Sequence, residues 1–134
     1  DVKTMEDASE GAKRKAMLIN GRVMYNRGES GAYDIFELLA TNRTTSEGAE
    51  AYYRLVEREF NNDNIDKAEQ MVYDLGDCGS VYWQAKCFIL LGDIMLKRDN
   101  AFQARATYQS IVDGYPVQND GIIDEVKERI NSIK

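Results

Sequence analysis

The 134-residue sequence contains no histidine, one proline and two cysteines, and it has no apolar run long enough to span a membrane. The absence of histidine removes the commonest general base and metal ligand. Cys87 therefore has no partner for papain-like chemistry. Walker, Rossmann and nucleophile-elbow spacings are also absent. We expect a protein that is not an enzyme, binds no cofactor or metal, and does not insert into a membrane.

Positive charge is in the minority. The chain has 17 Lys and Arg residues against 23 Asp and Glu residues, which gives a net charge of −6. The densest basic group, Lys13 to Lys15, is balanced by Glu6, Asp7 and Glu10 nearby. Because nucleic-acid binders usually present a basic stripe, this distribution argues against a nucleic-acid partner.

The two cysteines do not suit a disulfide. Cys78 falls in a predicted turn, and Cys87 lies more than two helical turns along the next predicted helix. The rise of a helix makes a bond between them unfavourable. We expect Cys87 to be a small core residue and Cys78 to be a surface or half-buried thiol. This leaves the redox compartment open.

Apolar residues recur at helical spacing between short polar turns. The clearest unit, 85–116, contains two helices joined by a turn at 97–100 and ends at Tyr115-Pro116. The pattern predicts hairpins at about 9–41, 46–76 and 80–115 and a last helix at about 120–133, after a frayed start at 1–6. The expected helix caps are Ser46, Ser80, Asn100 and Asp120, with Gly76 as a left-handed helix end.

Aligned apolar columns connect the three hairpins. Ala32, Ala68 and Ala104 are each 36 residues apart (68 − 32 and 104 − 68). The same step connects three further sets on the second and first helices, namely Phe36, Val72 and Tyr108; Leu39, Leu75 and Ile111; and Ile19, Leu55 and Leu91. A period in this range is typical of stacked helical repeats.

The third unit resembles a tetratricopeptide repeat. The matching positions are Phe88, Leu91, Gly92, Met95, Ala104, Tyr108, Ile111 and Pro116. The resemblance implies an all-α fold: a right-handed superhelix of three antiparallel helical hairpins plus a C-terminal capping helix, in a single domain over 1–134. The run from Ala104 to Pro116 is similar to repeats in bacterial cell-envelope proteins. That similarity implies a periplasmic location, with the cytoplasm as the alternative.

In that family the first helices line a concave face that binds partners. The positions carried over as candidate partner-binding residues are Met17, Met24, Tyr25, Tyr53, Glu57, Asn61, Ile89, Asp93 and Lys97. Their mixture of apolar, aromatic and charged side chains suits an extended or helical peptide with apolar anchors. We therefore expect a non-catalytic protein–protein interaction module that belongs to a larger multi-repeat protein.

A structural role is the alternative. The first hairpin has no upstream neighbour, so an exposed apolar edge there favours self-association or continued stacking in a longer scaffold. The last helix instead has a polar face that includes Glu125 and Arg129, an i,i+4 pair expected on its exposed side. Such a face is what the end of a solenoid needs, and we expect residue 134 to end it.

Overall fold

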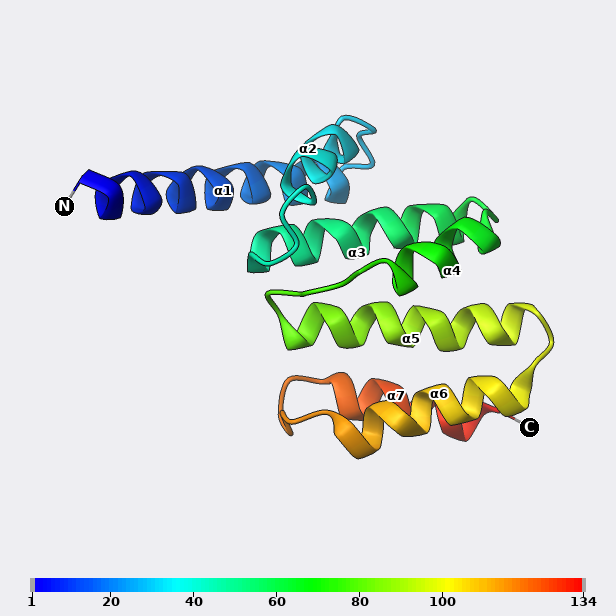
Figure 1. Ribbon diagram of the computed structural model, residues 1–134. Coiled ribbons are helices and arrows are strands. Elements are labelled where there is room, and N and C mark those ends of the chain that lie inside the picture. The colour runs from blue at the N-terminus through cyan, green and yellow to red at the C-terminus, as the bar shows by residue number, and fades with distance from the viewer. Residues whose placement is uncertain (1, 134) are drawn as a thin grey trace.

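The computed structural model describes the backbone of residues 2–133, and this part of the chain is all-α, without a strand (Figure 1). Its helices are α1 (Val2–Asn26), α2 (Ala32–Leu39), α3 (Ser46–Asn61), α4 (Ile65–Tyr73), α5 (Val81–Lys97), α6 (Ala101–Gly114) and α7 (Ile122–Ser132). None of them is both long enough and apolar enough to cross a membrane.

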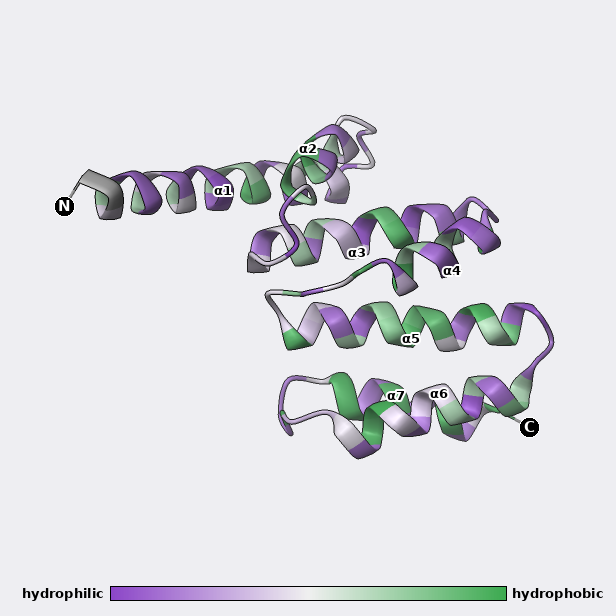
Figure 2. Cartoon of the chain, in the orientation of Figure 1, coloured by the Kyte–Doolittle hydropathy of each residue, from purple (hydrophilic) through white to green (hydrophobic). Residues whose placement is uncertain are grey.

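The helices pack as consecutive pairs. α1 packs on α2, α3 on α4 and α5 on α6, while α3 contacts both α1 and α5. Figure 1 shows α1, α3 and α5 following one another through the stack. α7 packs on α6 and α5 at the far end. α5 is apolar along most of its length (Figure 2), because it is covered by helices on several sides.

The first helix of each pair ends in the same turn. Gly28, Asp63 and Asp99 have positive φ angles of 74°, 65° and 59°. In each turn the following N–H, from Glu29, Asn64 or Asn100, donates to a carbonyl five residues earlier at 2.9 Å. This six-to-one hydrogen bond is the helix-ending pattern that a left-handed residue permits. The three pairs therefore share their turn geometry.

The alanine column of the second helices is confirmed. Ala32, Ala68 and Ala104 are all fully buried. Four residues further along, Phe36 and Tyr108 are fully buried as well. Small side chains at the first position let the second helix approach the first closely, and large ones at the next fill the space between them.

The predicted apolar column on the first helices, formed by Ile19, Leu55 and Leu91, is wrong at Ile19. The left-handed turn residues are 35 and then 36 residues apart (63 − 28 and 99 − 63). Gly21 lies against Phe36 just as Gly92 lies against Tyr108, so these glycines correspond. Ile19 is displaced by one position and is 59% exposed. The cause is that the first turn has one residue fewer between its left-handed residue, Gly28, and its buried alanine, Ala32, than the other two turns have.

The predicted helix ends hold in part. Ser80 and Asn100 cap α5 and α6 through their side chains, and Gly76 has a φ of 64°. The hydroxyl of Thr45, not Ser46, caps α3 by accepting from the Gly48 N–H. Asp120 accepts a hydrogen bond from the Ile122 N–H at 3.2 Å, although Gly121 is the residue that precedes α7.

The first hairpin starts earlier than expected. α1 begins at Val2 rather than near residue 9, and the helix includes most of the segment predicted to fray; residue 1 lies outside the described residues. The side chains of residues 4–10 are exposed. Figure 1 shows this end of α1 extending beyond the other helices. Local helix propensity and charge, not packing, decide the conformation here.

Candidate functional site

A cleft of about 310 Å³ lies between α1 and α3, and we call it the α1–α3 cleft. Its lining residues are Lys15, Leu18, Ile19, Arg22, Ser46, Glu47, Glu50 and Trp83. A second hollow of about 240 Å³ continues it toward Tyr25 and Asn26 and shares Arg22, Glu50 and Trp83 with it. Three helices far apart in sequence therefore contribute to one concave surface.

Buried carboxylates of α3 hold the guanidinium groups of α1. Nε of Arg14 lies 3.1 Å from Oε1 of Glu47, and Nη2 of Arg22 lies 2.5 Å from Oε1 of Glu50. Glu47 and Glu50 are only 8% and 3% exposed, whereas the Arg22 side chain is 52% exposed. Within the described residues Lys15 has no carboxylate within 4.0 Å. The mouth of the cleft therefore presents cations, although the chain as a whole is acidic.

The carboxyl group of Glu47 is tuned to stay ionised. Its pKa lies below the ordinary value of 4.5, chiefly because the Ser46 hydroxyl donates a hydrogen bond to it and also because of Arg14. Burial opposes this shift without cancelling it. The ion pair between α1 and α3 is consequently present at neutral pH.

Arg54 contacts the aromatic side chains in and beside the cleft. The guanidinium carbon of Arg54 lies 4.5 Å from the ring centre of Tyr25, 5.3 Å from Tyr53 and 5.7 Å from Trp83. Glu57 accepts hydrogen bonds from Tyr25 at 2.7 Å and from Arg54 at 3.0 Å. These contacts fix the rings, so Trp83 is held in place in the cleft.

The corresponding face of α5 is covered by α7. Nε of Arg129 lies 2.8 Å from Oδ1 of Asp93, which also accepts from the Tyr108 hydroxyl. Lys86 lies 2.9 Å from Glu125. Glu125 and Arg129 do pair, at 3.1 Å, but the prediction that this pair is on the exposed side of the helix is wrong, because both side chains also bind α5.

The structure brings only some of the predicted binding residues together. Tyr25, Tyr53 and Glu57 meet around Arg54, as described above. Tyr53 is 7% exposed and Ile89 is 2% exposed, so both contribute mainly to packing. Asp93 is paired with Arg129.

The remaining predicted residues lie elsewhere. Met24 lies against Gly31 beside α2. Met17 is half-buried and corresponds to Tyr52 and Phe88, so it faces its own hairpin rather than the cleft. Asn61 is exposed at the end of α3, and Lys97 at the end of α5 lies 4.0 Å from Asp63. The one-residue shift of α1 accounts for the placement of both methionines.

The same shift explains which cleft residues the sequence failed to indicate. Counting back 36 residues from Glu50 and Glu57 on the inner face of α3 gives Arg14 and Gly21, whereas the 35 residues between the observed turns give Lys15 and Arg22. The match between Gly21 and Gly92 is the signal that reveals this in the sequence. Trp83, the only tryptophan, lies five residues before Phe88, the first matched repeat position, and has no such signal.

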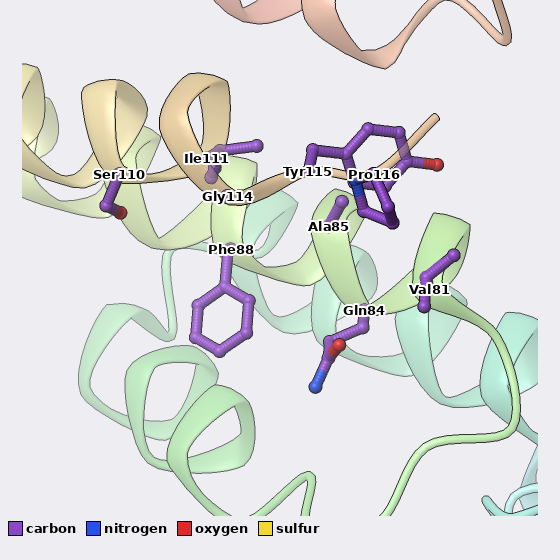
Figure 3. Close-up of a pocket in the computed structure, with 9 residues that line it drawn as sticks. All are labelled: Val81, Gln84, Ala85, Phe88, Ser110, Ile111, Gly114, Tyr115 and Pro116. Carbon is purple, nitrogen blue, oxygen red and sulfur yellow. The ribbon is translucent and has the colours of Figure 1, made fainter. Parts of the chain in front are cut away.

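An apolar pocket of about 270 Å³ lies between α5 and the end of α6 (Figure 3). Nine residues line it, none of them charged: Val81, Gln84, Ala85, Phe88, Ser110, Ile111, Gly114, Tyr115 and Pro116. The pocket holds no cysteine, lysine or carboxylate, and in the cleft the one hydroxyl, of Ser46, donates to Glu47, whose carboxylate also pairs with Arg14. Among the described residues, no three His, Cys, Asp or Glu side chains are placed to hold a metal ion.

No family model, curated protein or solved structure matches this chain. The resemblance to tetratricopeptide repeats therefore rests on the residues quoted for it.

Proposed function

We propose that the chain is a non-catalytic protein-interaction module with a tetratricopeptide-like superhelical arrangement, which binds a peptide segment in the α1–α3 cleft. The repeated turn, the buried alanine column and the corresponding glycines support the arrangement. The observation that carries the binding proposal is the cleft itself. It is concave, it is formed by three helices, and it combines an aromatic ring with cations at its mouth.

The lining indicates the chemistry of the peptide. Trp83, Leu18 and Ile19 offer apolar surface for one side chain. Lys15 and the half-exposed Arg22 offer positive charge beside it. Since the cleft carboxylates are already paired with arginines, a cationic peptide gains little there. The preferred ligand is a segment with an apolar anchor next to an acidic residue.

Catalysis has no support in either cavity, so the proposal is limited to binding. A periplasmic location stays a prediction that follows from the resemblance. The structural alternative has its own observation, since Ile19 and Val23 on the side of α1 away from α2 are 59% and 41% exposed.

Selection from a random peptide library displayed on phage tests the proposal. We expect the selected peptides to carry an acidic residue next to an apolar one. Lys15→Glu should weaken their binding by about tenfold, which corresponds to about 1.4 kcal/mol. Lys127→Glu, a matched change on the exposed side of α7, should leave binding unchanged.

Both variants change exposed lysines, so both should keep the helical circular dichroism of the parent. Selected peptides that are basic, or that bind equally well to the Lys15→Glu and Lys127→Glu proteins, would show that the cleft is not the binding site.

A further inference from the structure

The half-buried ring of Phe88 lines the apolar pocket between α5 and the end of α6. In Figure 3 the side chains of Phe88 and Gln84 extend to the same side of α5. The 36-residue step between the turns (99 − 63) relates Phe88 to Tyr52 on α3. The hairpin of α3 and α4 therefore contains an equivalent of this place.

An arginine covers the ring at that equivalent place. The guanidinium carbon of Arg43 lies 4.4 Å from the centre of the Tyr52 ring. Arg43 belongs to the loop between α2 and α3 and reaches the ring from there. A guanidinium is attracted by the electrons of an aromatic face, and its aliphatic stem covers apolar surface at the same time. The ring of the second hairpin thus has a guanidinium as its partner.

The loop before α5 supplies no such cation. Counting 36 residues on from Arg43 gives Gly79, which has no side chain. The whole segment 74–80 contains two aspartates and no basic residue. No side chain of this loop can therefore cover the Phe88 ring as Arg43 covers the ring of Tyr52.

The start of α5 also keeps its loop away from the ring. In the preceding hairpin the chain passes directly over Gly48, where a Cβ would lie 1.9 Å from the carbonyl oxygen of Asn42. Gln84 takes the place of Gly48 in α5 (84 − 48 = 36) and lines the pocket. Because a side chain here excludes the loop, the cavity of about 270 Å³ beside Phe88 is left open to a group from another molecule.

The electrostatics of the pocket suit a cation. α6 ends at Gly114, which lines the pocket, and the last carbonyl groups of a helix carry partial negative charge. Pro116 has no N–H, so it cannot donate to the Val112 carbonyl as the next residue of a continuing helix would. The lining contains no charged side chain that would repel a cation. A cation on an apolar stem fits this combination better than a neutral apolar side chain does.

We propose that the pocket binds an arginine side chain of a protein partner. Its guanidinium lies over Phe88 as Arg43 lies over Tyr52, with the end of α6 beside it. The pocket shares no residue with the α1–α3 cleft, so this inference does not depend on the peptide proposed for the cleft. The two surfaces also select opposite charges, since the cleft favours an acidic segment.

Titration of the isotope-labelled chain with N-acetylarginine amide, followed by NMR, tests the proposal. We expect shifts of the backbone amides around Phe88, Ser110 and Gly114, with a dissociation constant on the order of 1 mM. N-acetylcitrulline amide keeps the shape without the charge, and N-acetylleucine amide keeps only an apolar side chain. Both should bind at least about fivefold more weakly. Equal binding of either compound, or no shift in this region with about 50 mM of the arginine amide, would overturn the proposal.

Changes at Ser110 test where the guanidinium lies. Ser110 is exposed, lines the pocket and corresponds to Asp74 in the preceding hairpin. There, burial raises the pKa of the Tyr52 hydroxyl, Arg43 lowers it and Asp74 raises it, so both charges lie near the ring. Ser110→Asp should therefore tighten the binding of N-acetylarginine amide by about fivefold, and Ser110→Lys should weaken it by a similar factor.

Ser132→Asp is the matched control for Ser110→Asp. Both serines are exposed on helices, and each hydroxyl donates to the carbonyl oxygen three residues earlier. Ser132 lies on α7, outside the pocket lining, so this change should leave the affinity for N-acetylarginine amide unaltered. Equal effects of the two aspartate variants, or an affinity indifferent to Ser110→Asp, would show that the arginine does not bind in the pocket.

Discussion

Arg22 on α1 and Glu50 on α3 form a two-point ion pair across the first two hairpins. Nε of Arg22 donates to Oε2 at 2.8 Å and Nη2 donates to Oε1 at 2.5 Å. Glu50 is 3% exposed, so its carboxylate is removed from water and depends on this partner. The pair thus secures a helix contact that is otherwise much less extensive than that between α3 and α5.

We expect Arg22→Met to lower the free energy of unfolding by about 2 kcal/mol, because it leaves a buried carboxylate without its cation. The loss is below the range for fully buried pairs since the Arg22 side chain is half in solvent. Urea unfolding followed by circular dichroism measures it. Adding Glu50→Gln to this variant should recover part of the loss. Strictly additive effects of the two changes would show that the pair is not coupled.

Gly92 permits the closest approach of α6 to α5. A Cβ at this position would lie 2.2 Å from Cε1 of Tyr108, whose side chain is fully buried. We expect Gly92→Ala to destabilise the protein by about 2 kcal/mol or more, because the ring has no free space to move into. Thermal unfolding measures the change.

Gly114→Ala is the matched control for that prediction. Gly114 is also helical, at the end of α6, but a Cβ there meets nothing within 4 Å. This change should be neutral or stabilising, by up to about 1 kcal/mol. A similar loss of stability in both variants would attribute the effect to the backbone and not to the contact with Tyr108.

Local patterns were sufficient to predict where most of the helices and their turns lie. The all-α class and the turn after each first helix are legible in the spacing of apolar and polar residues, and the buried alanines in the 36-residue step. The orientation of α1 was not legible in these patterns. The segment from Gly28 to Ala32 has one residue fewer than the corresponding segments of the other two hairpins, and this rotates every α1 side chain by about 100° about the helix axis relative to the other first helices. A single period fitted to three copies hides that change.

The cleft was harder to predict because it depends on tertiary contacts. The family resemblance implies that Tyr25, Tyr53 and Glu57 share a face, and they do meet around Arg54. It does not indicate that α7 covers Asp93 through Arg129, since the two residues are 36 positions apart and lie on helices that do not form a hairpin with each other. Whether a polar residue on an inner face is free or already paired is decided by such distant partners.

The two thiols should differ strongly in reactivity. Cys87 is fully buried, and burial raises its pKa, whereas Cys78 is half-buried in the loop before α5. Because the thiolate is the reactive form, a maleimide should modify Cys78 in the native protein and Cys87 only when the protein opens. Mass spectrometry of the intact chain would show one rapid addition and one slow addition that urea accelerates. Two equally rapid additions would contradict the burial of Cys87.

Acid should weaken the contact between α1 and α3 through Glu47. The pKa of this carboxyl group is lower in the folded protein than its ordinary value of 4.5, first through the Ser46 hydroxyl and then through Arg14. Its contribution is therefore fully present above pH 4.5 and is lost as the pH falls through the folded value. We expect Glu47→Gln to be less stable than the parent at neutral pH and to lose less stability on acidification. Urea unfolding at neutral pH and at about pH 3 measures both, and equal losses in the two proteins would show that Glu47 is not responsible.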